Sequence, residues 1–444
     1  MKTIVAVSTA PMTSAIGIVR ISGEKAFEIS EKIFSKPLAG VGGYRVVYGK
    51  IYDGDKILDT ALATVFHAPN SYTGENTVEL SCHGSPYILN RVAELLVENG
   101  AVRAGRGEFS KMAYINGKMD AIQAEGVIDL IEAQTAAEVA AAQSELGGKI
   151  SEKVEEVRKK LVSLSADILA YVDYPDEDIA DVSPEKTEKT ISECYEEINS
   201  LALTYGRGRM IKNGVRTVIC GKPNAGKSML MNSILGCERS IVTETEGTTR
   251  DVVGESVVFG GVKLEVRDTA GIREAVDTVE KIGVRLAEKE LARADLILFV
   301  FDMSREKDEN DERVLEEIKK SNAKKIAVLN KSDIAEKSLE FEGFDASVTV
   351  SAKTGEGMKG LEKAVAAAVS EGVAPGEVVM NARQFECLCG CAAALKNALD
   401  NIAMTPDVLL DDVNEAIFCL SSVTGKGVSE QIIEDIFSRF CVGK

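Results

Sequence analysis

The stretch Gly221-Lys-Pro-Asn-Ala-Gly-Lys-Ser228 is the part of the sequence that decides how this chain folds. It fits the pattern GxxxxGK[ST], in which successive backbone N–H groups and a helix N-terminus face a chain of phosphates. The β-prone run Arg216–Cys220 precedes it, and the apolar segment Ser228–Leu235 after it is expected to form a helix closed by Gly236. A chance glycine-rich turn is the alternative, and this strand–loop–helix order makes it a poor one.

The loop's own side chains and the next motif both predict a site for phosphates and a metal ion. Lys227 is expected to reach the β- and γ-phosphates, and the hydroxyl of Ser228 is expected to bind Mg²⁺. A strand that ends at Asp268 opens the motif Asp268-Thr-Ala-Gly271. There the Asp268 carboxylate can hold the metal shell, and the Gly271 N–H can meet the γ-phosphate.

Later segments identify the base as guanine. The run Leu296–Asp302 is almost wholly apolar, which is typical of a buried parallel strand. Lys325–Leu329 then leads into Asn330-Lys-Ser-Asp333. The Asp333 carboxylate can accept hydrogen bonds from the ring N–H and the amino group of guanine, a pair that adenine cannot supply. Ser351-Ala-Lys353 suits a backbone contact to the guanine oxygen. Four motifs in register predict a Mg²⁺-dependent GTPase domain.

Two details narrow the type of GTPase. Ile272 stands where many small GTPases carry a glutamine that orients the attacking water, so hydrolysis needs another group. The acidic candidates downstream are Glu274, Asp277 and Glu280. Within the phosphate loop, the amide oxygen of Asn224 could coordinate a monovalent cation such as K⁺, which would supply positive charge beside the phosphates. A simple turn-forming residue is an equally good interpretation of Asn224.

Composition limits the class of protein. The chain has 444 residues, a length that suggests about two to four domains, and it is 45% hydrophobic and 27% charged. We find no apolar run near the ~18 residues that span a bilayer, and Met1–Ser8 is too short and strand-like for a signal peptide. Nine cysteines, an odd number, indicate reduced thiols, and we expect a cytoplasmic protein without a membrane segment.

Cysteine spacing and charge each leave an alternative open. Cys387, Cys389 and Cys391 alternate in a segment that looks helical, where this spacing does not place all three on one face, so a metal site is the weaker interpretation. The net charge of −18 argues against a free-standing nucleic-acid binder. A local basic patch remains open at Arg207, Arg209, Lys212 and Arg216, although a solvated linker explains it equally well.

The sequence divides into three kinds of region. An α+β pattern fills residues 1–118, with the β-rich runs Thr3–Val7, Ile16–Ile21, Tyr44–Tyr52, Leu58–Phe66 and Val78–Cys82 and helical stretches Glu24–Phe34 and Tyr87–Glu98. Residues 119–210 are helical, with breaks expected at Gly126 and Gly147-Gly148. The GTPase fold fills 211–372, and 373–444 are helical again. We therefore predict a multidomain protein in which an α/β P-loop GTPase domain is inserted into an all-α domain.

The whole chain resembles the MnmE (TrmE) family of tRNA-modifying GTPases. Motifs outside the GTPase domain carry this resemblance: Gly17-Ile-Val-Arg-Ile-Ser-Gly23, Ser71-Tyr-Thr-Gly-Glu75, Glu79-Leu-Ser-Cys-His-Gly84, Gly107-Glu-Phe-Ser110, Asn116-Gly-Lys-Met-Asp120, Gln123-Ala-Glu125, the acidic segment Asp173–Ile179 and Phe440-Cys-Val-Gly-Lys444. A GTPase of ribosome assembly or a regulatory switch is the alternative class. Neither needs the Asn-Gly-Lys-Met-Asp segment or the Cys-Val-Gly-Lys tail.

The resemblance implies a function and a set of partners. Such proteins are cytosolic homodimers that work with an FAD-containing partner, MnmG (GidA), in a heterotetramer or larger complex. Together they add an aminomethyl or carboxymethylaminomethyl group to carbon 5 of the wobble uridine of certain tRNAs. The N-terminal domain, which also dimerises, binds a tetrahydrofolate derivative (5-formyl- or 5,10-methylene-tetrahydrofolate) that is thought to supply the carbon.

The resemblance also assigns residues. Arg20, Glu79, Lys118 and Lys444 match folate-contacting positions, and Cys441 matches a cysteine with a suggested catalytic role. Thr249 matches a Mg²⁺ ligand, and Glu280 matches the residue that positions the attacking water. The K⁺ ligands would be Asn224, Thr243, Thr245 and Thr248. The full predicted GTP-binding set is Asn224, Ala225, Gly226, Lys227, Ser228, Met229, Thr243, Thr249, Asp268, Thr269, Ala270, Gly271, Asn330, Lys331, Asp333, Ser351, Ala352 and Lys353.

Three departures from the family pattern fall in the predicted folate domain. The usual Pro-Gly-Arg-Gly-Gly is Pro11-Met-Thr-Ser-Ala15 here, and the residues that lead into Gly-Glu-Phe109 are shifted over Arg103–Gly107. Ser85-Pro86 stands where a second glycine usually follows His83-Gly84. The lining of the folate pocket is therefore the part least securely carried over from the family.

Overall fold

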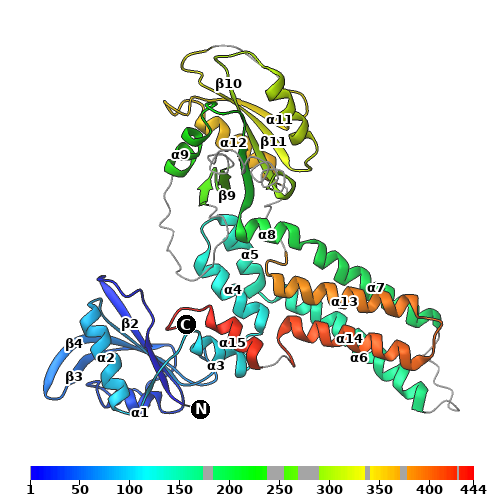
Figure 1. The fold of residues 1–444 in the computed structure, drawn as a ribbon. Helices are drawn as coiled ribbons and strands as arrows, with labels where there is room; N and C mark the ends of the chain where they lie inside the picture. Colours follow the sequence, from blue (N-terminus) through cyan, green and yellow to red (C-terminus); the bar gives the residue numbers. More distant parts are fainter. Residues whose placement is uncertain are drawn as a thin grey trace, which may run out of the picture. The chain divides into compact units, whose positions relative to one another are not determined.

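The computed structural model describes residues 2–173, 184–237, 255–268, 290–335, 341–370, 378–427 and 430–444 (Figure 1). The chain forms two compact units. The first comprises Met1–Ile128, Glu145–Cys194 and Gly390–Lys444, and the second comprises Asp129–Ser144 and Tyr195–Cys389. The boundaries between the units fall inside four helices, α4 (Ala121–Glu132), α5 (Ala136–Leu146), α7 (Pro184–Leu203) and α13 (Ala382–Asp400).

The first unit contains a six-stranded sheet in the order β3-β4-β5-β2-β1-β6. The five β-rich runs predicted from the sequence are confirmed as β1 (Ile4–Val7), β2 (Ile16–Ser22), β3 (Arg45–Asp53), β4 (Lys56–Phe66) and β5 (Thr77–His83). These strands pair antiparallel. The short β6 (Val102–Arg103), which was not predicted, pairs parallel with β1 at the edge of the sheet.

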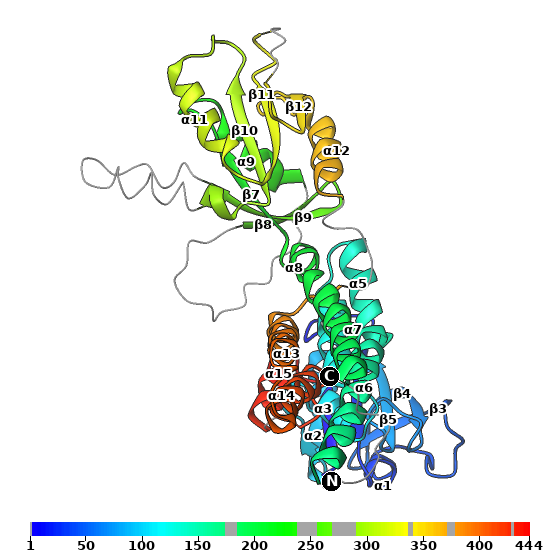
Figure 2. The ribbon, with the colours of Figure 1, turned by 90° about the vertical axis from the view of Figure 1, so that its right-hand side faces the viewer.

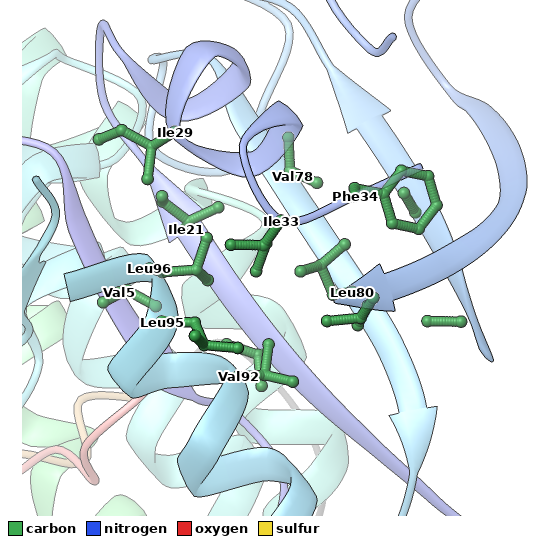
Figure 3. Close-up of a cluster of buried hydrophobic side chains, with 14 of the residues drawn as sticks. Val5, Ile21, Ile29, Ile33, Phe34, Val78, Leu80, Val92, Leu95 and Leu96 are labelled. Carbon is green, nitrogen blue, oxygen red and sulfur yellow. The ribbon is translucent and has the colours of Figure 1, made fainter. Parts of the chain in front are cut away.

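Helices α1 (Ala26–Glu31) and α2 (Pro86–Glu98) cover one face of this sheet. Figure 3 shows the resulting core, in which Ile21 and Leu80 from the strands meet Leu96 of α2. Successive side chains of a strand point to opposite faces, so the residues between these apolar positions point away from α2. Arg20 and Glu79, which are register partners on β2 and β5, fall on that second face.

Helix α3 (Glu108–Ile115), also not predicted, packs on the second face. Phe109 is fully buried there against Ile4 and Ala6 of β1. Met112 of α3 and Ala104 complete this small core, and the Phe109 ring lies 5.6 Å from the Arg20 guanidinium. The second face thus carries a packed layer next to polar side chains, which is an arrangement suited to a site.

The helical part of the first unit follows the prediction at one break and not at the other. α5 (Ala136–Leu146) ends and α6 (Lys149–Asp173) begins at Gly147-Gly148, where Gly148 has a φ of +76°. Gly126 does not break the chain, because α4 runs through it. A single glycine costs a helix only about 1 kcal/mol relative to alanine, which packing offsets.

Of the remaining helices of this unit, α14 (Pro406–Thr424) packs on α6 and α15 (Glu430–Ser438) packs on α3 and α4. α14 lies along α6, where the Ser165 hydroxyl donates to Asn414 Oδ1 at 2.9 Å. α15 contributes Ile436 and Phe437 to a cluster with Ala121 and Ala124 of α4. α13 confirms a helix through the three closely spaced cysteines. Cys389 is exposed there and Cys391 is buried, so the two side chains face different surroundings.

The second unit contains a six-stranded sheet in the order β12-β11-β10-β7-β9-β8 (Figure 2). The strands are β7 (Val215–Cys220), β8 (Glu255–Phe259), β9 (Val262–Asp268), β10 (Leu296–Asp302), β11 (Lys324–Asn330) and β12 (Ala346–Thr349). All neighbours pair parallel except the edge strand β8. Every residue of β10 is buried, which confirms the prediction of a buried parallel strand.

Helices cover both faces of this sheet, as in other doubly wound α/β folds. α9 (Lys227–Cys237) and α12 (Met358–Val369) pack on one face, and α11 (Glu309–Lys319) packs on the other. The predicted end of the first helix at Gly236 is wrong, because α9 continues to Cys237. Among the described helices, none is both long enough and apolar enough to cross a bilayer.

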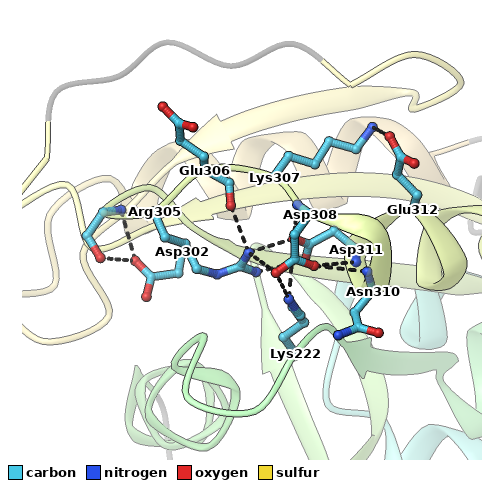
Figure 4. Close-up of polar contacts among 10 residues, drawn as sticks. Lys222, Asp302, Arg305, Glu306, Lys307, Asp308, Asn310, Asp311 and Glu312 are labelled. Atoms are coloured by element: carbon cyan, nitrogen blue, oxygen red, sulfur yellow. Dashed lines mark hydrogen bonds and ion pairs between the residues drawn. The ribbon is translucent and has the colours of Figure 1, made fainter.

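An ion-pair cluster anchors the start of α11 beside the phosphate loop (Figure 4). Asp308 is the N-cap of α11 and forms a capping box with Asp311, and it pairs with Lys222 of the loop. Arg305 donates two hydrogen bonds to the Asp311 carboxylate, at 2.6 and 2.7 Å. Burial raises the pKa of Asp311, but its hydrogen bonds, with that from Arg305 foremost, hold it below the usual value of 3.8. These residues were not predicted from the sequence, where the spacing Asp308-x-x-Asp311 before an amphipathic run was the available signal.

Replacing Asp311 by asparagine should destabilise the second unit by about 2 kcal/mol, the scale of hydrogen bonds to charged groups. Because the folded-state pKa of Asp311 is lowered, this contribution is complete above pH 3.8 and disappears as the pH falls through the folded-state value. Urea unfolding at a series of pH values should therefore show the difference between Asp311→Asn and wild type narrowing in acid. Glu316→Gln, an exposed position on the same helix, is the control. Equal stability at neutral pH would contradict this account.

Candidate functional site

The phosphate loop joins β7 to α9 through backbone conformations that favour glycine. Gly221 and Gly226 have φ values of +139° and +94°. A Cβ on Gly221 would lie 2.3 Å from the carbonyl oxygen of Val300, and one on Gly226 would lie 2.1 Å from Asn330 Nδ2. No side chain fits at either place, so the two glycines let the loop approach β10 and β11. This produces a narrow backbone cradle at the start of α9.

The predicted phosphate ligands line this cradle. Lys227 is largely buried, and its ammonium donates to the carbonyl oxygen of Lys222 at 2.8 Å, folded back over its own loop. Ser228 and Met229, in the first turn of α9, are exposed. Asn224 is exposed with a φ of +63°, a left-handed conformation that asparagine tolerates. That conformation accounts for an asparagine without any cation, so a potassium role for Asn224 stays a prediction.

The buried amide of Asn330 joins two loops of the site. Its Nδ2 donates to the carbonyl oxygen of Ala225 at 2.8 Å, and its Oδ1 accepts from the N–H of Ala352 at 3.0 Å. The side chain is 2% exposed. A second link runs from the Ser233 hydroxyl of α9 to the carbonyl oxygen of Ala352, at 2.9 Å. The phosphate loop and the loop after β12 are therefore held in one fixed arrangement.

The carboxylate of Asp302 positions Lys331, which follows Asn330 in the guanine motif. Lys331 has a left-handed φ of +69°, and its ammonium donates to Asp302 Oδ2 at 2.6 Å. Burial raises the pKa of Asp302, while the hydrogen bonds from Lys331 and Ser304 bring it below its usual value. Asp302 was not predicted as a site residue. The available signal was a carboxylate that directly ends a buried apolar strand.

The predicted base-reading residues lie at the ends of neighbouring strands. Asp333 is exposed, and one of its carboxylate oxygens accepts from the Ser351 hydroxyl at 2.8 Å. Ser351 is buried and Lys353 is exposed. Because the carboxyl ends of parallel strands share one edge of a sheet, the structure gathers these residues beside the phosphate loop. The arrangement offers backbone N–H groups to phosphates and a carboxylate to a base.

Asp268 is the last residue of β9 and pairs in register with Ile219, next to the phosphate loop. The predicted switch and cation residues are outside the described residues: Thr243, Thr245, Thr248, Thr249, Thr269, Ala270, Gly271, Ile272, Glu274, Asp277 and Glu280.

A second cluster of predicted residues lies on the first unit's sheet. Arg20 Nε donates to Glu79 Oε1 at 2.8 Å, and its guanidinium lies 5.5 Å from the Tyr72 ring and 5.6 Å from the Phe109 ring. Burial and the nearby charge of Arg20 lower the pKa of Lys444, while Glu79 and Cys441 act in the opposite direction. Arg20, Glu79 and Lys444 are thus brought together, with Cys441 near enough to act on their charges.

Main-chain contacts hold the chain end in this cluster. The carbonyl oxygen of Lys444 accepts from the N–H of Phe109 at 3.1 Å, and that of Gly443 accepts from the Ser8 hydroxyl at 3.0 Å. Gly443 has a φ of +99°, and a Cβ there would lie 2.5 Å from the carbonyl oxygen of Val7. Lys118 is exposed, and its side chain lies close to Gly74, two residues after Tyr72.

Cys441 lines a pocket of about 360 Å³ at the end of β1. The lining is mainly apolar and consists of Val5, Ala6, Val7, Thr9, Pro11, Met12, Pro86, Leu89, Asn90, Arg103, Ala104, Cys441 and Val442. Three of the segments where the sequence departs from the family pattern contribute to it, through Pro11, Met12, Pro86 and Arg103. The exposed thiol of Cys441 therefore borders a cavity large enough for a small organic molecule.

Three of the four basic residues predicted before the phosphate loop pair with carboxylates, and the fourth, Arg207, is exposed. Arg209 pairs with Asp295 at 2.6 Å, Lys212 pairs with Asp129 at 2.7 Å, and Arg216 lies 3.8 Å from Glu265. Arg209, Lys212 and Arg216 therefore have carboxylate partners within the second unit and do not form an open phosphate-binding patch.

Replacing Asn330 by alanine should weaken binding of GDP and GTP about tenfold or more. Loss of the amide leaves the buried groups of Ala225 and Ala352 without their partner, at a cost of about 1–3 kcal/mol, and loosens both loops. Nucleotide titration of the full chain measures the effect. Asn322→Ala, an exposed asparagine just before the same strand, should bind as wild type does. Unchanged affinity in Asn330→Ala would show that the bridge does not organise the site.

Comparisons with known proteins agree with this geometry. The family model described as "GTP-binding protein TrmE N-terminus" matches residues 3–118, and the "MnmE helical domain" model matches residues 122–441. A tRNA modification GTPase MnmE from Carboxydothermus hydrogenoformans is 40% identical over 100% of this chain and 99% of that protein. Those from Acetivibrio thermocellus and Clostridioides difficile are 38% identical with the same coverage.

Among solved structures, the chain is similar to Era from Aquifex aeolicus bound to GDP and AlF4⁻. The identity is 27% over 40% of this chain and 66% of that chain, with a TM-score of 0.30. A score of this size carries no weight, so the family assignment rests on the sequence matches. Those matches extend over the whole chain and over the whole of the relatives, and on them the chain belongs to the MnmE family of tRNA modification GTPases.

Proposed function

We propose that this chain is a K⁺-stimulated GTPase that acts with an FAD-containing partner, MnmG (GidA), on tRNA in the cytoplasm. Together they would add an aminomethyl or carboxymethylaminomethyl group to carbon 5 of the wobble uridine. The observation that carries the proposal is the presence, in one chain, of a guanine-nucleotide cradle and a separate pocket that contains the thiol of Cys441. The first would supply a conformational cycle and the second would hold a carbon donor.

In the GTPase part, each residue has a task that fits its surroundings. The ammonium of Lys227, which now caps a loop carbonyl, would turn to the β- and γ-phosphates. The exposed hydroxyl of Ser228 would bind Mg²⁺ together with Thr249, beside Asp268. Asp333, already oriented by Ser351, would accept the two guanine N–H groups.

Hydrolysis would depend on K⁺ and on pairing of two GTPase domains. Ile272 cannot orient water, so Glu280 would do so, directly or through a second water. Asn224, Thr243, Thr245 and Thr248 would hold K⁺, whose charge stabilises the transition state as an arginine does elsewhere. The loop that carries the threonines would close when a second GTPase domain packs over it.

The pocket beside Cys441 fits a one-carbon tetrahydrofolate derivative. Its volume of about 360 Å³ and its apolar lining suit a flat ring system. Arg20, Glu79 and Lys444 form a separate polar cluster that does not line this pocket. They would orient the polar groups of a folate that extends from the pocket past Cys441, with Lys118 at the exposed edge. The carbon donor would be 5-formyl- or 5,10-methylene-tetrahydrofolate, and it supplies the carbon that is added to the base.

The first unit also offers a surface for homodimerisation. Val46 and Tyr48 of β3 and Leu62 of β4 are 56%, 61% and 45% exposed, and Tyr48 and Leu62 are register partners. Large apolar side chains gathered on the open face of an edge hairpin are typical of a protein interface. We assign dimerisation and folate binding to residues 1–118, helical segments to 119–210 and 373–444, and the inserted GTPase domain to 211–372.

GTP turnover should be much faster in K⁺ than in Na⁺ at matched ionic strength. Asn224→Ala should lose this difference, since it removes one ligand of the cation. Glu280→Ala should bind GTP normally but turn over about 10²–10⁴-fold more slowly, the usual effect of losing a proton-transfer or water-positioning group. Equal rates of the wild type in the two salts would leave Asn224 as a turn residue.

Mass spectrometry of wobble nucleosides tests the whole proposal. Cells that lack this protein should lose the modification, and expression of the wild-type chain should restore it. Cys441→Ser should fail to restore it while its GTP turnover stays near normal, because the thiol borders the pocket of the first unit and not the nucleotide site. Cys389→Ser, an exposed cysteine elsewhere in the chain, is the matched control and should restore modification. Full restoration by Cys441→Ser would show that the thiol of Cys441 takes no part in the modification reaction.

A further inference from the structure

We propose that two lysine–carboxylate pairs of the second unit, Lys263–Glu138 and Lys212–Asp129, couple the nucleotide state of the GTPase sheet to helices α4 and α5. This inference rests on the proposed GTPase function and assigns residues to its conformational cycle. The four residues and Asn381 are called the junction below. They act by positioning other elements and do not touch the nucleotide.

The junction is a continuous network of charged groups. Lys263 of β9 pairs with Glu138 Oε1 at 2.9 Å, and it donates to the carbonyl oxygen of Lys212 at 3.0 Å. Lys212, in the last turn of α8 (Tyr205–Asn213), pairs with Asp129 Oδ1 at 2.7 Å and donates to the side-chain oxygen of Asn381. The Asp129 and Glu138 side chains are each only 7% exposed.

Glu138 ties Lys263 to the start of α5. Its second oxygen, Oε2, accepts from the backbone N–H groups of Gln134 and Thr135 at 2.7 and 2.8 Å. The Thr135 hydroxyl in turn accepts from the N–H of Glu138 at 3.2 Å, which completes a capping box. One carboxylate therefore fixes both the first turn of α5 and the ammonium of β9, so a shift of β9 is passed directly to α5.

The junction holds the amino ends of two strands that meet the nucleotide site at their carboxyl ends. β9 begins one residue before Lys263 and ends at Asp268. β7 follows α8 through Gly214 and ends at the phosphate loop, and the two strands pair in register from Val215↔Leu264 to Ile219↔Asp268. A Cβ on Gly214 would lie 3.2 Å from the carbonyl oxygen of Lys263, so the two strand starts are in close contact.

Apolar packing and a small cavity surround these charges. Ala141 and Ala142 of α5 pack against Ile211 of α8 and against Val378 and Met380. A cavity of about 30 Å³ is lined by Asp129, Glu132, Glu138, Lys212, Lys263 and Met380. This volume is enough for one water molecule among polar partners.

The chemistry of the junction points to coupling more than to stability. Buried ion pairs can often be replaced by apolar residues without loss of stability, because desolvation offsets their attraction. Their best-attested use is to specify one arrangement among several. All five residues of the junction belong to the second unit, and Asp129 lies near the C-terminal end of α4.

Amide hydrogen exchange of the full chain, loaded with GDP or with a non-hydrolysable GTP analogue, tests the proposal. In the wild type, amides in the first turn of α5 should exchange at rates that differ about fivefold or more between the two nucleotides, the lower end of typical allosteric coupling. The double variant Lys263→Met/Glu138→Gln, which removes both charges together and keeps a capping-box side chain, should lose this difference. Amides of α12 serve as an internal reference and should exchange as in the wild type.

A matched control comes from the neighbouring strand β11. Lys324 and Asp345 form a more exposed lysine–carboxylate pair at its amino end, at 3.3 Å. Lys324→Met/Asp345→Asn should keep the nucleotide-dependent difference in α5. A wild type without that difference, or a junction double variant that retains it, would overturn this inference alone. Failure of the wild type to bind guanine nucleotides would overturn the proposed function and this inference with it, so nucleotide affinity is measured on the same samples.

Discussion

The close approach of the phosphate loop to the neighbouring strand ends is the constraint on which the nucleotide site depends. The backbone at Gly221 and Gly226 comes so near to Val300 and Asn330 that no Cβ can be accommodated. The buried amide of Asn330 lies beside Gly226. It donates a hydrogen bond to a carbonyl of the phosphate loop and accepts one from an N–H of the loop after β12. Because a buried polar group without a partner is costly, these three segments keep one relative arrangement. The exposed groups, Asn224, Ser228 and Asp333, are positioned by that frame.

A comparable constraint organises the first unit. The antiparallel register sets Arg20 opposite Glu79 on the face away from α2, and the last residues of the chain return to the same place. Gly443 can pass over Val7 only because it has no side chain, and the Lys444 carbonyl completes the start of α3. Burial lowers the pKa of Lys444, so this ammonium gives up its proton more readily than the ammonium of a solvated lysine. Because these residues are far apart in sequence, they come together only when the whole unit is folded.

The chain has a net charge of −18, and many cations of its second unit form ion pairs within the fold. In the second unit, Arg209, Lys212, Lys263 and Arg305 each pair with a carboxylate of low exposure. Two groups of ion pairs lie at the two ends of the strands. The pairs of Lys222 and Arg305 lie near the nucleotide cradle, and those of Lys212 and Lys263 lie at the amino ends. The cations therefore serve to fix elements to one another, and recognition of phosphates is left to the backbone cradle and Lys227.

The sequence by itself determined the class of the two sheets, the five long strands of the first unit, the buried strand β10 and the order of the nucleotide motifs. These follow from hydrophobic periodicity and from motifs in which neighbouring residues act together, so local chemistry is sufficient. The short β6, helix α3 and the uninterrupted helix at Gly126 were decided by packing, which outweighs the weak local preferences of such segments. Only the tertiary structure decided which polar groups meet. Asn330 bonds a residue 105 positions away and Lys263 one 125 positions away, and no local pattern encodes partners that the fold alone brings together.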